Sequence, residues 1–299
     1  MSSAEPTDGA LNEAPFWRQV CSSGHLIVSG PLNDAHRVTV HGEALFVRWR
    51  QVFDTEYGQS FAGERQVPTE IAHRAAIPQL RHLVRDETGR EAIAVFDWID
   101  GRKPRCGELP DDLIDLLAAV HEIPAPGFGN LGGPYATDEA GPFIGALIAT
   151  EAERLHQRGP ETDARHAAEA ALEHLVCFAG EPPCLCHGDI HRDNVINKRD
   201  GAIALVDWEA VRYRVAAADF NQLTVDWLSE EQAGKVVAAY AERCGRDRRT
   251  LGAQIALMRL LWHLRTYNFK VLVRRERPSR HLRHLRAATD EFKAMQRYT

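Results

Sequence analysis

Long apolar runs are missing from this chain of 299 residues. Its most hydrophobic stretch, Ile255 to Leu264, is interrupted by Arg259 and His263, whereas a helix that crosses a bilayer needs about 20 apolar residues. The first residues contain neither a basic start nor an apolar segment, so no secretory signal is expected. We therefore expect a cytoplasmic protein that does not bind membranes.

Cysteine and lysine are both scarce. The six cysteines are scattered, and the one close pair, Cys184 and Cys186, has no second pair that would complete a zinc site. We expect these thiols to stay reduced and buried. Five lysines stand against thirty-one arginines, and none of the five precedes Lys103. Any cationic role before that position therefore falls to an arginine.

The charge is low but unevenly spread. The net charge is −6 and the sequence holds no nucleic-acid recognition motif, so we do not expect nucleic acid as a partner. The segment from Lys270 to Thr299 nevertheless has nine basic and three acidic residues, which gives it +6 and leaves −12 for the remainder. This segment can face an anionic substrate or form a solvated helix face, and both readings stay open.

The hydrophobic pattern changes at the turn-rich stretch from Asp100 to Pro104. Before it, apolar residues alternate as in strands, and after it they recur at helical spacing. We predict strands at 25–28, 37–41, 44–49, 79–84 and 92–96, a helix near 69–76, and later helices near 109–123, 141–157, 161–178, 229–243 and 250–275.

Two short strand-like pieces, 185–186 and 203–206, interrupt the helical part. We expect them to form a hairpin around the loop that joins them. The chain is thus predicted to be an α+β protein. Residues 1–20 would be a loose lead-in, residues 21–99 a β-rich lobe, and residues 100–299 a mainly helical lobe.

The loop between these pieces carries polar residues suited to phosphoryl transfer. Asp189 lies in the run His187-Gly188-Asp189, Asn194 follows five residues later, and Asp207 ends the second strand piece. Carboxylate and amide oxygens are ligands that Mg²⁺ accepts, and it keeps phosphate and water as its other ligands. A remaining carboxylate can accept the proton of an attacking hydroxyl. Phosphoryl transfer needs this positioning and charge neutralisation more than covalent catalysis.

The pattern H-G-D-x-x-x-x-N, followed by a hydrophobic strand and D-W-E, resembles the aminoglycoside phosphotransferase and choline kinase family. Those small-molecule kinases are similar in fold to protein kinases, so the resemblance implies a bilobal, protein-kinase-like structure. It also implies that Asp189 is the catalytic base, that Asn194 and Asp207 are magnesium ligands, and that His187 braces the loop. Asp219 resembles a structural aspartate of the family.

The resemblance extends to the first lobe. The run from Ser29 to Asp34 is similar to the nucleotide loop and includes Asn33. Phe46-Val47-Arg48 resembles the strand that carries the phosphate-binding cation. Arg48 fits this role best, and Arg50 on the same strand face is the alternative.

Two further nucleotide contacts are implied. The partner of Arg48 would be a glutamate, for which we favour Glu64 over Glu70. The segment Asp97-Trp98-Ile99 corresponds to backbone that hydrogen-bonds the nucleotide base in this fold.

The resemblance implies a kinase that uses Mg²⁺ and ATP or GTP to phosphorylate a hydroxyl of a small molecule, as a monomer or homodimer. We expect the acceptor to be an antibiotic or related natural product. Choline, an amino alcohol or a sugar is the alternative. A protein kinase is disfavoured because no D-F-G or A-P-E motif follows. A non-catalytic nucleotide-binding module would be expected to lack one of Asp189, Asn194 and Asp207, and all three are present.

Overall fold

The computed structural model describes residues 13–29, 33–51, 61–67, 71, 77–110, 112–131, 133–156, 162–223, 227–273 and 278–296. The chain forms two compact units. The first comprises Met1–Arg102 with Ile196–Ala210, and the second comprises Lys103–Val195 with Val211–Thr299. The helix expected near 69–76 lies outside the described residues, apart from Ile71.

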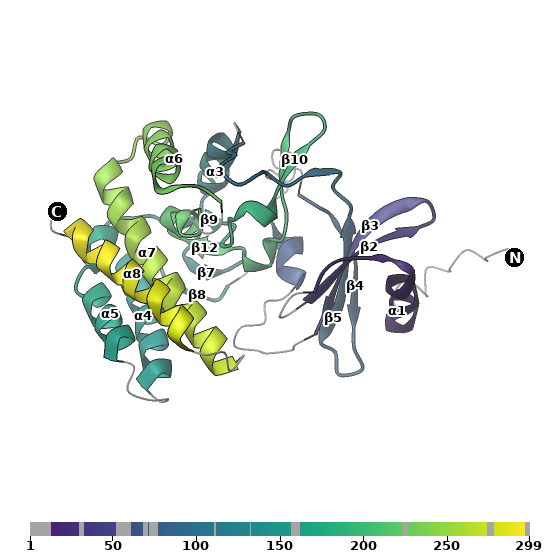
Figure 1. The fold of residues 1–299 in the computed structure, drawn as a ribbon, viewed down its shortest axis with the longest axis horizontal. Coiled ribbons are helices and arrows are strands. Elements are labelled where there is room, and N and C mark those ends of the chain that lie inside the picture. Colours follow the sequence, from purple (N-terminus) through teal and green to yellow (C-terminus); the bar gives the residue numbers. More distant parts are fainter. Residues whose placement is uncertain are drawn as a thin grey trace, which may run out of the picture. The chain divides into compact units, whose positions relative to one another are not determined.

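An antiparallel five-stranded sheet forms the body of the first unit (Figure 1), in the order β1-β2-β3-β5-β4. The tight turn between β2 and β3 uses His41 and Gly42, whose φ angles of 52° and 82° are those that a type I′ hairpin turn requires. The predicted strands are confirmed as β1 (His25–Ser29), β2 (Asn33–Val40), β3 (Glu43–Arg50), β4 (Leu80–Arg85) and β5 (Glu91–Asp97).

Helix α1 (Ala14–Ser23) packs on this sheet, where the sequence analysis expected a loose lead-in. Trp17 and Cys21 lie one helical turn apart, and both are buried against Val47 and Val95. This apolar stripe is narrow and lies within a polar stretch, so its helical signal in the sequence is weak. The helix closes one face of the core of the first unit.

The expected hairpin of 185–186 with 203–206 is wrong. The strands β9 (Cys184–Cys186) and β11 (Ile203–Leu205) belong to separate sheets. Three-residue strands have too little periodicity to reveal their partners. In the first unit the order is β11-β10-β6, with β10 (Val195–Lys198) and β6 (Gly101–Arg102). In the second it is β8-β7-β12-β9, with β8 (Tyr135–Thr137), β7 (Phe128–Asn130) and β12 (Arg212–Arg214).

Helices dominate the second unit, as predicted. The helix α7 is central, because it packs against α4, α5, α6 and α8 and buries residues around most of its circumference. A π-helical turn at Phe269–Val273 ends it. The helices are α3 (Leu113–His121), α4 (Ala140–His156), α5 (Thr162–Leu172), α6 (Glu230–Arg243), α7 (Arg248–Asn268) and α8 (Pro278–Gln296).

Short 3₁₀ turns complete the chain: η2 (Phe61–Gln66), η3 (Leu175–Phe178), η4 (Arg192–Asn194), η5 (Trp208–Ala210) and η6 (Ala216–Phe220). Three of them, η4 to η6, lie in or next to the predicted motifs, where they place polar side chains. Within the described residues, no helix combines the length and the hydropathy needed to span a membrane.

Candidate active site

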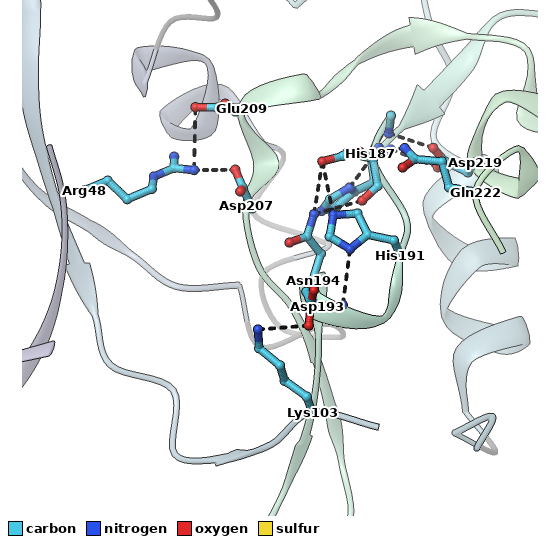
Figure 2. A network of polar contacts seen from close by, with 12 residues as sticks. Arg48, Lys103, His187, His191, Asp193, Asn194, Asp207, Glu209, Asp219 and Gln222 are labelled. Carbon is cyan, nitrogen blue, oxygen red and sulfur yellow. Dashed lines mark hydrogen bonds and ion pairs between the residues drawn. The ribbon is translucent and has the colours of Figure 1, made fainter. Parts of the chain in front are cut away.

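The first unit holds a group of three carboxylates around one arginine. Arg48, on β3, is 4% exposed. Its Nη2 pairs with Glu64 and its Nη1 with Asp207, and Nη1 also lies 3.6 Å from Oε2 of Glu209. The neighbour on the same strand face, Arg50, has its Nη2 3.8 Å from Oε2 of Glu209. Figure 2 shows Arg48 pointing toward Asp207 and Glu209. The glutamate that pairs with Arg48 is thus Glu64; Glu70 lies outside the described residues.

Aromatic rings hold these guanidinium groups in place. The guanidinium carbon of Arg48 lies 4.9 Å from the ring centroid of Phe61 and 5.1 Å from that of Phe96. Arg50 lies 4.2 Å from the ring of Phe61. Such contacts attract a cation without adding a formal charge. The rings on η2 and β5 therefore position the two arginines without neutralising their positive charge.

The electrostatics of this group favour an additional cation. Burial, reinforced by Asp207 and Glu209 and opposed by Arg48, raises the pKa of Glu64 to about 8. Burial alone would lower the pKa of Arg48, but the surrounding carboxylates outweigh it and raise that pKa. The ligand oxygens of Glu64, Asp207 and Glu209 all lie within 4.8 Å of one another. An all-oxygen set of this kind fits Mg²⁺.

The backbone of Asp207 is unusual. Its φ of 66° lies in the left-handed region, where only one other non-glycine residue of the described chain, His41 in its hairpin turn, is found. This conformation costs about 1 kcal/mol for an L-residue and is tolerated better by Asp than by most others. Strained backbone is concentrated at sites where a side chain must be aimed. The strain at Asp207 thus accompanies its placement against Arg48.

The second unit holds the loop with Asp189. Both carboxylate oxygens of this residue are engaged: Oδ1 accepts a hydrogen bond of 2.6 Å from Nε2 of Gln222, and Oδ2 accepts one of 3.2 Å from Nδ2 of Asn194. Nε2 of His191 lies 3.5 Å from Oδ2. Burial would raise the pKa of Asp189, but the bonds from His191 and Gln222 outweigh it and lower that pKa. The carboxylate is therefore ionised at neutral pH, and its side chain remains 37% exposed.

The amide of Asn194 is oriented by the same loop. Its Nδ2 also donates to the backbone oxygen of Asp189 at 2.9 Å. Both bonds use the nitrogen, and within the described residues no hydrogen bond uses Oδ1. The amide oxygen, which is the atom suited to a metal ion, is thus left available.

Asp219 anchors the base of this loop. Its two oxygens accept hydrogen bonds from the backbone nitrogens of His187 (2.9 Å) and Gly188 (2.6 Å), and Oδ2 lies 3.1 Å from Nε2 of His121. Gly188 has a φ of 84°, which favours glycine. Nδ1 of the fully buried His187 accepts from the backbone nitrogen of Asp189 at 3.3 Å. Asp219 therefore holds the start of the loop that carries Asp189, and Figure 2 shows Asp219 beside His187.

The comparison with known families decides the assignment. The family model described as the phosphotransferase enzyme family matches residues 28–253, about three quarters of the chain. The chain belongs to this family. No curated protein sequence matches this phosphotransferase.

Solved structures of similar fold are antibiotic phosphotransferases. A mutant of aminoglycoside 2′-phosphotransferase-IIIa in complex with GDP has a TM-score of 0.67 at 16% identity, covering 95% of this chain and 100% of that one. A thermostable mutant of aminoglycoside phosphotransferase APH(4)-Ia, in ternary complex with ADP and hygromycin B, has a TM-score of 0.66 at 16% identity, covering 95% and 97%. The macrolide 2′-phosphotransferase MphH from Brachybacterium faecium has a TM-score of 0.58 at 17% identity, covering 90% and 91%. The predicted protein-kinase-like α+β fold is confirmed.

The other predicted nucleotide contacts of this phosphotransferase lie in the first unit. Asn33, at the start of β2, has a buried Oδ1 that makes no hydrogen bond within the described residues. The side chain of Asp97 accepts a bond of 2.5 Å from Arg81, and the ring of Trp98 lies 5.1 Å from the guanidinium of Arg37. Ile99 is half-buried. Their roles in nucleotide binding remain predictions.

Gln222 is the site residue that sequence reasoning missed. It is 5% exposed, and its side chain meets Asp189 from 33 positions along the chain. Its one signal is chemical: it is a polar residue, three positions after Asp219, between the buried Phe220 and Leu223. A buried glutamine requires hydrogen-bond partners, so such a position marks a polar contact, although it does not identify the partner.

Proposed function

We propose that this phosphotransferase moves the γ-phosphate of ATP or GTP, bound with Mg²⁺, to a hydroxyl group of a small molecule. The proposal rests on the ionisation, the exposure and the hydrogen bonds of the Asp189 carboxylate. Its carboxylate is ionised, half-exposed and held by Gln222, Asn194 and His191. This is the arrangement that a residue needs in order to orient a hydroxyl and accept its proton.

Each remaining residue takes a role that its contacts support. The free amide oxygen of Asn194 and the carboxylate of Asp207 would ligate Mg²⁺, which neutralises phosphate charge when bound. Arg48 would keep Glu64 and exchange Asp207 for phosphate oxygens, because its two Nη atoms already point to separate partners.

Further contacts would hold the nucleotide. The backbone of Asp97, Trp98 and Ile99 would bind the base, because Arg81 already occupies the side chain of Asp97. Asn33 would contact the nucleotide through its unsatisfied oxygen, since a buried acceptor without a partner is costly.

For the acceptor we propose an antibiotic or a related natural product, which would make the protein a resistance or tailoring enzyme. Support comes from the fold neighbours, whose names include aminoglycoside and macrolide phosphotransferases. Because their identity to this chain is only 16–17%, the acceptor must be found by experiment.

The test is a mass-spectrometric screen. Aminoglycosides, macrolides, nucleoside and peptide antibiotics, sugars, choline and amino alcohols would each be incubated with ATP or GTP and Mg²⁺. The Asp189→Ala variant serves as the control. We expect a product 80 Da heavier than one acceptor, made by the wild type alone, as one HPO₃ group adds about this mass. Absence of both product and Mg²⁺-dependent nucleotide binding would overturn the proposal.

A further inference from the structure

Three arginines of the second unit make no ion pair with any residue that the structure describes. Arg212 and Arg214 lie on β12, Arg265 lies on α7, and all three are partly exposed. Across the part of the chain that the structure describes, none of their side chains makes an ion pair or a hydrogen bond. Most other arginines with comparable burial, such as Arg246, pair with a carboxylate. These three side chains can therefore still accept an anionic partner.

The three charges act on one another. Arg265 is close enough to lower the pKa of both strand arginines, after the larger effect of burial. Burial, Arg212 and Arg265 together lower the pKa of Arg214 to about 9. Like charges gathered in a partly desolvated place destabilise a fold unless an anion joins them. Arrangements of this kind are typical of binding sites.

The sheet places this cluster next to the loop that carries Asp189. Arg212 lies opposite Cys186 in the pairing of β12 with β9, and Arg214 lies opposite Cys184. Residues two apart on a strand share a face, so both arginines project from the same side of β12. Cys186 directly precedes His187, and Asp189 follows three residues after Cys186. The cluster therefore lies at the strand that leads into the proposed catalytic loop.

The nearby carboxylate does not neutralise this cluster. Asp219 acts on the charge of Arg214, but its oxygens already accept bonds from the backbone of His187 and Gly188 and contact His121. The Asp219 side chain is fully buried and holds the loop that carries Asp189. Among the described residues, therefore, no carboxylate pairs with Arg212 or Arg265.

We propose that Arg212, Arg214 and Arg265 bind an anionic group of the acceptor, a carboxylate or a phosphate ester, while its hydroxyl meets Asp189. The inference rests on the proposed function, because it assigns the acceptor of that same reaction. Guanidinium groups suit this task, since each can donate two parallel hydrogen bonds to a carboxylate or phosphate. The same charges would repel a polycationic acceptor, so aminoglycosides should be poor substrates.

The first experiment measures anion binding without any turnover. Inorganic phosphate would be titrated by calorimetry into the wild-type protein, the double variant Arg212→Gln/Arg265→Gln, and Arg105→Gln as a matched control with an exposed arginine of the same unit. We expect the double variant to bind phosphate at least about tenfold more weakly, since charged hydrogen bonds are lost. The control should bind as the wild type does. Phosphate binding that the double variant does not weaken would overturn the subsite.

The second experiment asks whether the bound anion belongs to the acceptor. Matched hydroxy acids and hydroxy amides would be compared as acceptors. We expect the acid to be preferred by about tenfold or more in kcat/KM, and the double variant to lose this preference. Equal turnover of acid and amide by the wild type would overturn the acceptor assignment.

Two additional variants separate the possible failures. Arg212→Lys keeps the charge and should retain part of the phosphate affinity, which shows that a weakened variant is not merely misfolded. Asp189→Ala should bind phosphate as the wild type does. If phosphate binding depends on Arg212 and Arg265 but neither a phosphorylated product nor Mg²⁺-dependent nucleotide binding is found, the proposed function falls while the anion subsite stands.

Discussion

The side-chain nitrogen of Gln222 lies 2.6 Å from Oδ1 of Asp189, and Gln222 is almost fully buried. The bond fixes one carboxylate oxygen, while Asn194 holds the other. Because each bond is made to the charged form, both favour an ionised and oriented Asp189. Gln222 is thus a positioning residue for the proposed base.

Replacing Gln222 with leucine should therefore lower turnover. We expect Gln222→Leu to reduce kcat by about tenfold, with little change in the nucleotide KM, because a hydrogen bond to a charged group is lost. Since that bond lowers the pKa of Asp189, its removal raises the pKa and shifts the acidic limb of the kcat profile to higher pH. Steady-state kinetics extended down to about pH 3, below the ordinary pKa of an aspartate, would show both effects.

Gln254→Leu provides the control. This buried glutamine is 2% exposed and bonds to Cys177 and Glu181, away from Asp189. It should lose stability without any shift of the pH profile. If Gln222→Leu also lost stability without a shift of the pH profile, the role of Gln222 would be structural only.

The contact between His121 and Asp219 predicts a pH-dependent stability. Burial would lower the pKa of His121, but the bond to Asp219 outweighs it and the pKa rises to about 9, against about 6.5 in an unfolded chain. The stabilisation is full below pH 6.5 and is lost as the pH rises through 9. We expect it to be on the order of 3 kcal/mol.

Urea unfolding from pH 6 to 9.5 would measure this contribution. The free energy of unfolding of the wild type should fall over that range more steeply than that of His121→Gln, which cannot bind the extra proton. Parallel pH dependences of the two proteins would show that the ion pair of His121 with Asp219 does not control stability.

Helix α1 leads to a prediction about the first unit. Trp17 has no exposed surface and packs on the sheet with Val47 and Val95. Trp17→Ala should lower the free energy of unfolding by about 3–5 kcal/mol, the usual loss for a buried aromatic residue. Gln19→Ala, at an exposed position of the same helix, should change it by less than about 0.5 kcal/mol. A small effect of Trp17→Ala in denaturant unfolding would mean that α1 does not dock stably.

Local patterns explain why most of the fold could be predicted from the sequence. The long strands and helices carry their own periodicity, and the spacing of Asp189 and Asn194 is fixed within one loop. The alternation of side chains along β3 is enough to predict that Arg48 and Arg50 lie on the same face of the strand.

Contacts that depend on tertiary packing could not be predicted. The strands β7, β8 and β12 are three residues long, so their pairing follows from the surrounding helices rather than from their own sequence. Glu209 reaches Arg48 and Arg50 from a position more than 150 residues away. The approach of Arg265 on α7 to the arginines of β12 likewise links distant segments. No local rule connects such pairs.

The carboxylates around Arg48 predict how the first unit responds to Mg²⁺. Arg48→Ala removes the guanidinium that pairs with Glu64 and Asp207. Loss of one partner from a buried ion pair costs about 3–5 kcal/mol, because the remaining charge is left unpaired. The variant should therefore unfold at a lower temperature and, under the proposed function, show a higher nucleotide KM.

Mg²⁺ should restore part of that loss. The oxygens of Glu64, Asp207 and Glu209 lie within 4.8 Å of one another, and without Arg48 a divalent ion can replace the missing charge. We expect millimolar Mg²⁺ to raise the melting temperature of Arg48→Ala more than that of the wild type. Arg85→Ala, which removes an exposed arginine of the same sheet, should respond as the wild type does. An equal response of all three proteins would show that these carboxylates do not attract a metal ion, and the ligand role of Asp207 would then have to depend on the nucleotide phosphates.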